Sequence, residues 1–460
     1  MSALEDTFAA FIARQTGASD ATVVSFDRLS GGAIQDNFGL TLDLEGGNRP
    51  GRHEFVVRQD APSGVAESLT RPQEFRVLQA AFGAGVTAPE PLWLCEDPAV
   101  TGQVFYVMAR AAGSASPRKL VKSEFTDEQR RALVRTFGAE LARLHSIRPP
   151  YDSLDFLAMP NPDNPALSRV ALYRRYLEEI GEPHPVLEWA LNWLEDNAPE
   201  PGPTVLCHCD FRTGNYMISG DRLTAILDWE FAAWSDPCED LGWLCSRSWR
   251  FGADEREVGG IGDKQDLLDG YREVTGASIS PARVNYWEVM ALVRWAAIAL
   301  QQARRHMSGE QRSLELALTG RMVAQMEYDL LNQIQELEDG NANRPETRDL
   351  LAEARQVLLD SLVPELGGER KYEALMIANA MGMAIREQEQ QEAGEPESTD
   401  VMLSRFLAGH ALPEESEQGE QTLARALRER VVDGSDRELR AVLRAMTETR
   451  LKVNNPGYLK

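Results

Sequence analysis

The stretch between residues 205 and 228 constrains the fold of this chain most. Short apolar runs of the kind that form β-strands lie at 205–208, 216–218 and 224–228. Helical periodicity precedes and follows them. A polar loop joins the first two runs and carries His208, Asp210 and Asn215. Because strands hold both ends of this loop, we expect its polar side chains to occupy fixed positions.

The hydrophobic pattern changes once along the rest of the chain. Residues 1–110 combine an amphipathic helix over 1–25 with short strands and one inserted helix over 68–83. The strand patterns fall at 26–29, 40–44, 55–58, 93–94 and 104–108. From residue 111 the pattern is mostly helical, and it is strongest at 127–146, 165–197 and 264–337. The sequence therefore predicts an α+β protein whose small sheet precedes a helical region.

Three domain-sized parts follow from these patterns. We expect an N-terminal lobe with the small sheet over 1–110, a helical lobe over 111–337 and a C-terminal helical domain over 344–460. The acidic stretch 336–343 contains glycine and asparagine and is interpreted as the linker before the third part.

The composition restricts the partners and the compartment. The formal net charge of -24 argues against a protein that binds the phosphate backbone of nucleic acids. The N-terminus lacks the basic and apolar regions of a signal peptide, and no run of about 18 apolar residues could span a membrane. The five cysteines are scattered, which argues against a disulfide framework. We expect a cytoplasmic protein without nucleic-acid or membrane partners.

The loop at 208–215 has the residue types that phosphoryl transfer requires. That reaction needs a group to take the proton of an acceptor hydroxyl, and cations across the phosphates. Asp210, directly after a strand, is placed to act as the base. Asn215 and Asp228 supply the amide and carboxylate oxygens that Mg²⁺ prefers. His208 is expected to organise the loop backbone rather than transfer the proton.

A simpler interpretation of the same residues remains open. Asp210 and Asn215 also suit a hairpin turn, and Asp228 suits a cap. The order of strand, loop, strand and carboxylate-ending strand favours the catalytic interpretation.

The motif His208-x-Asp210-x-x-x-x-Asn215, followed by Leu-Asp228-Trp-Glu, resembles the aminoglycoside phosphotransferase and choline kinase branch of the kinase-like superfamily. The resemblance covers roughly residues 20–335. It implies a two-lobed, protein-kinase-like fold with a small antiparallel sheet in the first lobe and a mainly helical second lobe. It also implies ATP and magnesium as cofactors, with Asp210 as the catalytic base.

A second segment supports this resemblance. The sequence Asp236-Pro-Cys-Glu-Asp240-Leu-Gly resembles the family segment that supports the catalytic loop. Cys209 is a departure, because the family usually has glycine at that position, and it puts the loop conformation in question but not the role of Asp210.

The resemblance also suggests nucleotide contacts in the first lobe. Gly31 and Gly32 would let backbone N–H groups approach the phosphates. Arg58 stands where kinases place a phosphate-binding lysine, and Glu74 would pair with it. The hinge against adenine would include Met108. Each also has a purely structural interpretation: the glycines as a hairpin tip, Arg58 as a surface arginine at a strand end, Glu74 as a solvated helix residue and Met108 as part of a buried strand.

Glu230 lies two residues after Asp228 and would share its face if the strand continued. It would then support a second magnesium ion or Arg58. A solvent-facing strand end is an equal alternative.

Arginines among aromatic residues in the helical part indicate an acceptor site. Buried cations need partners, and an anionic, hydroxylated ligand would supply one for Arg250 and Arg294, with Trp287 beside them. The wider pattern resembles the phosphotransferase domains associated with acyl-CoA dehydrogenases. That resemblance implies a small-molecule substrate with a hydroxyl on an acyl chain.

The last segment, 344–460, resembles a small helical domain of unknown function. We expect it to dock a partner, either a second copy or an acyl-CoA enzyme. Two other functions remain open for the whole chain. One is an aminoglycoside-type antibiotic kinase, and the other is a nucleotide-binding module without turnover.

Overall fold

The computed structural model describes residues 3–29, 35–60, 68–161, 164–312, 314–342, 399–413, 419–454 and 456–459, with short pieces at 358–359, 363–366 and 374. The chain divides into two compact units. The first comprises Met1–Ile180 with Trp193–Met326, and the second comprises Gly181–Asn192 with Glu327–Lys460.

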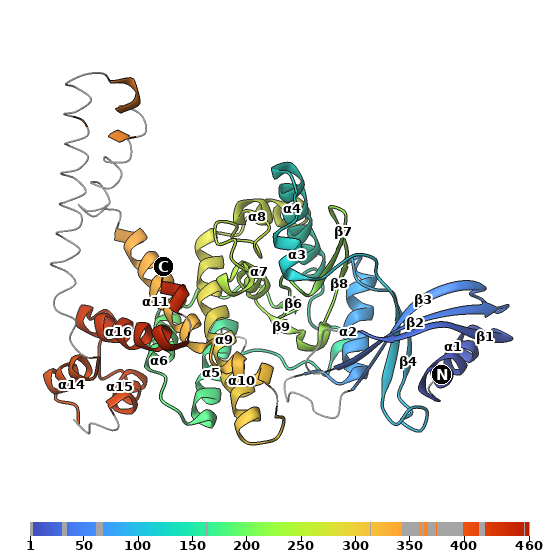
Figure 1. The fold of residues 1–460 in the computed structure, drawn as a ribbon, viewed down its shortest axis with the longest axis horizontal. Helices are drawn as coiled ribbons and strands as arrows, with labels where there is room; N and C mark the ends of the chain where they lie inside the picture. Colours follow the sequence, from blue (N-terminus) through green and yellow to red (C-terminus); the bar gives the residue numbers. More distant parts are fainter. Residues whose placement is uncertain are drawn as a thin grey trace. The chain divides into compact units, whose positions relative to one another are not determined.

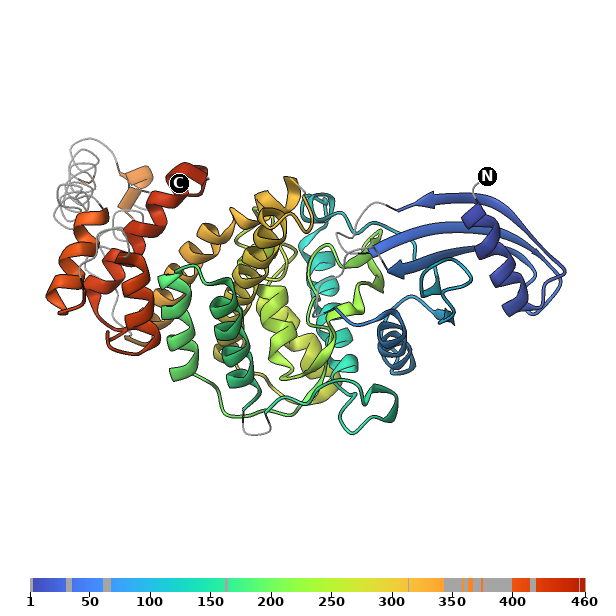
Figure 2. The same cartoon turned by 90° about the horizontal axis from the view of Figure 1, so that it is seen from below.

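The first unit begins with a five-stranded antiparallel sheet (Figure 1). In spatial order its strands are β1 (Asp20–Arg28), β2 (Gln35–Glu45), β3 (Gly51–Asp60), β5 (Phe105–Ala109) and β4 (Pro91–Cys95). Helix α1 (Ala3–Thr16) packs on one face (Figure 2). Alternate residues of β2, namely Leu40, Leu42 and Leu44, are buried in the core that α1 closes.

The predicted helix over 1–25 is too long. Helix α1 ends at Thr16, and Gly17 follows with a φ of 69°, a left-handed conformation that suits glycine. Strand β1 already begins at Asp20. The apolar residues of β1 extended the helical pattern in the sequence, and the glycine marks its true end.

Helix α2 (Arg71–Gly83) lies between β3 and β4 in the sequence. Thr70 and Gln73 form a capping box at its start, and Pro72 occupies the first turn, where no backbone donor is needed. This start fixes the first turn of the helix, so Arg71 and Glu74 project into the interior, where both are buried.

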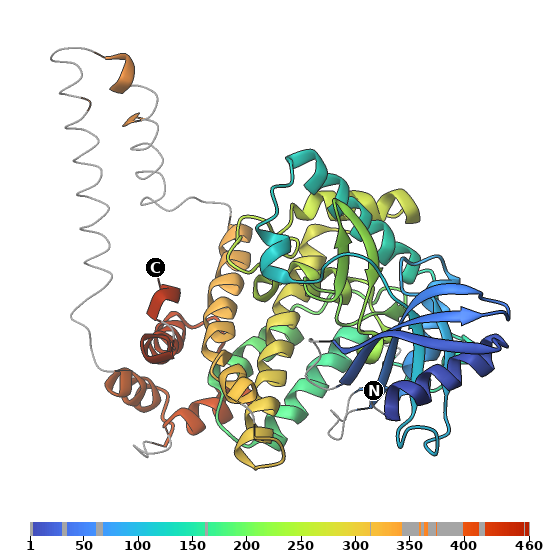
Figure 3. The same ribbon diagram turned by 45° about the vertical axis from the view of Figure 1, so that its right-hand side comes forward.

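The helical lobe of the first unit carries small strands on the side that faces the sheet (Figure 3). Its helices are α3 (Pro117–Val121), α4 (Asp127–Leu144), α5 (Pro165–Ile180), α7 (Cys238–Cys245), α8 (Lys264–Thr275), α9 (Pro281–Met307) and α10 (Leu314–Gly320). Strand β6 (Val205–Cys207) pairs with β9 (Ala233–Ser235), and β7 (Tyr216–Ser219) pairs with β8 (Arg222–Ile226). Single 3-10 turns lie at η1 (Asp152–Leu154), η2 (Trp229–Phe231) and η3 (Arg247–Trp249). The predicted kinase-like fold is confirmed.

The described residues of the second unit are mainly helical, as predicted for the C-terminal part. The unit contains α11 (Val323–Ala342), which starts in the first unit, then η5 (Val363–Glu365), α14 (Thr399–Gly409), α15 (Gly419–Arg428), α16 (Arg437–Asn454) and η6 (Pro456–Leu459). The interpretation of 336–343 as a linker is wrong for 336–342, which continue α11. Glu338 forms an ion pair with Arg440 of α16, a tertiary contact that the composition of the stretch does not reveal.

Helix α6 (Pro185–Asp196) contributes its first eight residues to the second unit. Trp189 Nε1 donates to the carbonyl of Gly434 at 3.0 Å, and Asn192 Nδ2 donates to that of Leu427 at 2.6 Å. Glu188 pairs with Arg428. The second unit is therefore assembled from two separate stretches of the sequence.

Among the described residues, no helix is long and apolar enough to cross a membrane.

Helices α4 and α8 cross closely because a glycine stands at the crossing. A Cβ on Gly138 would lie 2.1 Å from the Leu267 carbonyl oxygen and 2.7 Å from the Tyr271 nitrogen. We expect Gly138→Ala to destabilise the protein by about 1–3 kcal/mol, the usual cost of overpacking. Denaturant unfolding of the full chain, followed by tryptophan fluorescence, measures the change.

Gly83 at the end of α2 provides the control, since nothing lies within 4 Å of its added Cβ. Gly83→Ala should be neutral or stabilising by up to about 1 kcal/mol, because alanine favours helix. Equal unfolding midpoints for the two variants would contradict the close-packing argument.

Candidate active site

The loop between β6 and β7 is held by a single buried carboxylate. Asp240 Oδ2 accepts from the His208 backbone N–H at 2.8 Å, and Oδ1 accepts from that of Cys209 at 2.7 Å. The His145 Nε2 atom lies 3.1 Å from Oδ2. Burial alone would raise the pKa of Asp240, but the contacts with His145 and His208 hold it below its ordinary value. Asp240 is therefore an ionised anchor for the loop backbone.

Asp236 supports the same region from the start of α7. Its Oδ1 accepts from the Cys238 N–H at 2.8 Å, and its Oδ2 pairs with Arg283. This fixes the first turn of the helix that carries Asp240.

The Cys209 backbone explains why a glycine is common at its position in similar loops. Its φ is 59°, in the left-handed region. The two hydrogen bonds that Asp240 makes to the loop, one of them to Cys209 itself, hold this conformation. The buried thiol accepts from Arg169 Nη2 at 3.7 Å.

His208 has both ring nitrogens occupied. Its Nδ1 accepts from the Asp210 backbone N–H at 3.1 Å, so Nε2 carries the proton and donates to the Leu227 carbonyl at 2.8 Å. Burial lowers the pKa of His208, which keeps the ring neutral. His208 therefore ties the loop to the end of the next hairpin and cannot act as the base.

Asp210 lies at the centre of converging donors. Its Oδ1 accepts from Trp243 Nε1 at 3.0 Å and from Arg212 Nε at 3.2 Å, and its Oδ2 accepts from Asn215 Nδ2. The Asn215 side-chain Nδ2 also donates to the Asp210 backbone carbonyl at 3.0 Å. These bonds orient the carboxylate, and they leave the Asn215 side-chain oxygen for another partner.

Asp228 is brought to Asn215 by the hairpin. The Leu227 N–H donates to the Asn215 carbonyl at 2.8 Å, so Asn215 and the residue before Asp228 are neighbours in space. The sequence predicts that Asp228 ends a strand, and this is wrong. Strand β8 ends at Ile226, and Asp228 has a left-handed φ of 61°. The two residues offer hard oxygen ligands from neighbouring positions, a donor set that fits Mg²⁺.

The predicted pair of Arg58 and Glu74 is present and buried. Arg58 Nε lies 3.1 Å from a Glu74 carboxylate oxygen, and Arg58 Nη1 donates to Asp228 Oδ1 at 2.8 Å. Arg58 thus links helix α2, strand β3 and the candidate metal ligand. Burial opposes its charge, but Glu74 and Asp228 raise the pKa of Arg58 well above its usual value.

Arg71 is a member of this cluster that the sequence analysis missed. It pairs with Glu74, donates to Asp60 Oδ1 at 2.9 Å and lies 3.5 Å from Glu230 Oε2. Only its burial, which the sequence does not show, distinguishes it from a surface arginine at a helix start. Glu230 does not share a strand face with Asp228, because the chain enters η2 there, and it lies instead 3.8 Å from Arg58 Nη2.

Of the other predicted nucleotide contacts, the structure describes Met108 but not Gly31 or Gly32. Met108 lies in β5, paired with Val56, and is nearly buried. Gly31 and Gly32 lie outside the described residues.

Two of the three predicted acceptor residues lie together. Arg294 and Trp287 line one small cavity, and the Arg294 guanidinium lies 4.5 Å from the Trp243 ring centroid. Arg250 has other partners, since it donates to the carbonyls of Cys245 at 2.9 Å and Asp254 at 3.0 Å. The structure therefore does not bring Arg250 to Arg294.

Glu239 is the acidic residue that lines this small cavity, and it already pairs with arginines. Arg169 Nε donates to Glu239 Oε2 at 2.9 Å, and Arg294 Nη1 lies 3.6 Å from Oε1. Sequence analysis missed both Arg169 and Glu239, since they come from distant segments. The hydrogen bond from Trp243 to Asp210 was not predicted either, because it joins two separate segments.

The acid dependence of stability tests the role of Asp240. Because its folded-state pKa is lowered, its stabilisation is complete above the unfolded-state pKa of about 3.9 and is lost as the pH falls below it. We expect Asp240→Asn to cost about 1.5–3 kcal/mol at neutral pH, where charged hydrogen bonds are lost. Denaturant unfolding at neutral and acidic pH measures the difference.

The difference between wild type and Asp240→Asn should shrink as the pH falls below about 4. Asp155→Asn, at an exposed position, should show no such behaviour. A difference that stays constant with pH would argue against an ionised anchor.

Comparisons with known proteins bear on the family and the fold of this chain. Residues 25–276 match the phosphotransferase enzyme family, and residues 364–458 match a domain of unknown function, DUF6285. A putative aminoglycoside phosphotransferase from Ralstonia eutropha has a similar structure, with a TM-score of 0.55 and 21% identity, covering 70% of this chain and 95% of that one.

Two curated relatives are acyl-CoA dehydrogenase family members. Member 10 of Mus musculus is 29% identical over 196 residues, which are 41% of this chain and 18% of the relative. Member 11 of Pongo abelii is 26% identical over 288 residues, which are 59% of this chain and 36% of the relative. The matched regions thus span about a third of these relatives or less. With more than half of its length matched, and with the loop geometry described above, the chain belongs to the phosphotransferase enzyme family.

Proposed function

We propose that this protein transfers the γ-phosphoryl group of ATP to a hydroxyl group of a small molecule. The observation that carries the proposal is the position of Asp210. Three side-chain donors orient its carboxylate, and the two candidate metal ligands, Asn215 and Asp228, come from the adjoining hairpin. Positioning of this kind is what phosphoryl transfer requires of a protein.

Asp210 accepts the proton of the acceptor hydroxyl in this mechanism. The hydroxyl oxygen forms a bond to the γ-phosphorus while the bond from that phosphorus to the oxygen of ADP breaks. His208 is neutral and has both nitrogens engaged, which leaves the proton to Asp210. Asn215 and Asp228 would hold magnesium, which supplies positive charge across the phosphates.

Arg58 would orient the metal ligand Asp228, and its contact with the phosphates remains a prediction. It is buried and bonded to Asp228 and Glu74, so its guanidinium has a defined direction. Gly31, Gly32 and Met108 remain predictions for nucleotide contact, and the choice of ATP follows from the family. A docking role for 344–460 likewise remains a prediction.

The acceptor that this site favours is an alcohol without multiple positive charges, such as a hydroxyacyl compound. We call the side chains of Arg169, Arg212, Arg294 and Glu239 the acceptor wall, because its arginines contact Cys209, Asp210 and Trp243. Glu239, the acidic residue of this wall, already pairs with two of these arginines. The relationship to acyl-CoA dehydrogenase family members supports the same class. An aminoglycoside would instead need acidic walls, although one structurally similar protein is named for that activity.

Asp210→Asn tests the base directly. The amide keeps the shape but cannot accept the proton, so kcat should fall by about a hundred- to ten-thousand-fold. Steady-state kinetics with a panel of hydroxy acids measures kcat, and calorimetry measures ATP affinity, which should be retained.

Asp221→Asn removes a carboxylate from the exposed turn of the same hairpin and should leave kcat unchanged. If Asp210→Asn turned over ATP at the wild-type rate, the proposal would fail. A protein that binds ATP but phosphorylates no alcohol would support the alternative, a binding module without turnover.

Arg294→Ala tests the acceptor wall. We expect it to lower kcat/KM for an anionic acceptor by about tenfold or more, the effect of losing one charged hydrogen bond. ATP affinity should not change. Arg250→Ala is the matched arginine control, since Arg250 bonds to carbonyl oxygens and pairs with Glu288.

Arg250→Ala should lower the melting temperature without a specific effect on acceptor KM. Unchanged acceptor kinetics in Arg294→Ala would remove this residue from the acceptor site.

A further inference from the structure

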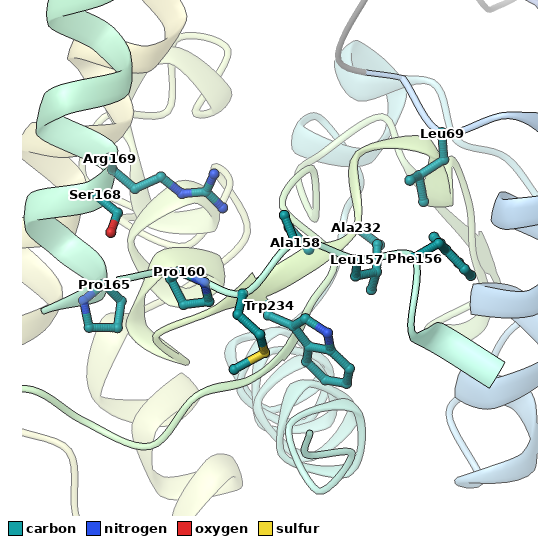
Figure 4. A pocket seen from close by; sticks show the side chains of 12 residues that line it. Leu69, Phe156, Leu157, Ala158, Pro160, Pro165, Ser168, Arg169, Ala232 and Trp234 are labelled. Atoms are coloured by element: carbon teal, nitrogen blue, oxygen red, sulfur yellow. The ribbon is translucent and has the colours of Figure 1, made fainter. Parts of the chain in front are cut away.

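A mainly apolar cavity of about 300 Å³ is lined by residues 156–160, the start of helix α5 and residues 232–234 around strand β9, with Leu69 opposite (Figure 4). Twelve residues line it, and all except Ser168 and Arg169 are apolar. Its volume is at the lower end of the range for small-molecule sites, about 300–1,000 Å³. Met159, one of the lining residues, is 58% exposed to solvent. The cavity is thus accessible to a small ligand.

Residues of the cavity wall contact the 208–215 loop, the strand before it and the segment that carries Glu230. Its wall includes Ala233 of β9, which pairs with Cys207, the last residue before the catalytic loop. Arg169, another wall residue, contacts the thiol of Cys209, next to Asp210. Leu69, on the opposite side in Figure 4, donates its N–H to the Glu230 carbonyl at 2.8 Å.

Apart from Ser168 and Arg169, the wall offers no polar side chain to a ligand. None of its twelve residues is acidic, and its charged member, Arg169, is neutralised by Glu239 at 2.9 Å. Leu157 and Trp234 instead present buried apolar surface. A polar group placed there would lose its hydrogen bonds to water without replacement, whereas an apolar chain would gain from leaving water.

We propose that this cavity binds an aliphatic segment of the acceptor while the hydroxyl of the same molecule lies at Asp210. The inference rests on the proposed function and narrows the acceptor to an amphiphilic alcohol. It excludes a sugar or a polyamine from the cavity. Each methylene group that enters is worth about 0.8 kcal/mol, which corresponds to about a fourfold gain in affinity.

Binding of a homologous series from hydroxybutyrate to hydroxydecanoate, with the hydroxyl at one fixed position, tests this directly. Calorimetry on the full chain, in the presence of magnesium and a non-hydrolysable ATP analogue, gives each Kd. We expect Kd to fall about fourfold per added methylene until the cavity is full. A Kd that does not change with chain length, or tighter binding of an aminoglycoside than of hydroxydecanoate, would overturn the proposal.

Ala158→Trp provides the matched variant, because Ala158 lines the cavity from an exposed position and its replacement does not disturb the core. The indole should fill the cavity and abolish the gain for the longer chains, while the Kd of hydroxybutyrate and of the ATP analogue stay unchanged. Ala99→Trp, at an exposed turn of the first lobe, is the control and should keep the full gain.

A chain-length gain that survives Ala158→Trp would also overturn the proposal. The binding data are independent of catalysis. Chain-length-dependent binding without phosphoryl transfer would therefore contradict the proposed function and leave the cavity assignment standing, and transfer to alcohols without chain-length dependence would do the reverse.

Discussion

The bonds from the Asp240 carboxylate to two consecutive backbone N–H groups determine the rest of the site. They hold His208 and Cys209 in place, and the left-handed turn at Cys209 then directs Asp210 toward Trp243 and Asn215. A buried carboxylate is stable only with such partners. The geometry of the candidate site is thus a consequence of satisfying one charge in the core of the helical lobe.

A second set of buried charges connects the two lobes of the first unit. Arg58 from the sheet and Arg71 from helix α2 share Glu74, and both approach Glu230 beyond the hairpin. In a low-dielectric interior such charges are stable only as a balanced group. The position of α2 relative to Asp228 is therefore set by ion pairing as well as by apolar packing.

The sequence predicted the parts of this structure that depend on local spacing. The two-lobed fold followed from a change of hydrophobic period and from the family resemblance, and the pairing of Arg58 with Glu74 followed from the resemblance alone. Arg71 was missed because its burial depends on Asp60 and Glu230, tertiary partners from two other segments, as well as on Glu74 in its own helix. The end of β8 was placed two residues late, because the left-handed turn at Asp228 leaves no mark in the apolar pattern.

The second unit combines the C-terminal helices with the first eight residues of α6. A fragment beginning at residue 327 would lack Trp189 and Asn192, whose polar groups engage the carbonyls of Gly434 and Leu427. Recombination that moved the C-terminal segment alone into another gene would leave these carbonyls without their donors. The C-terminal helices thus depend on helix α6 of the same chain to satisfy these two carbonyl groups.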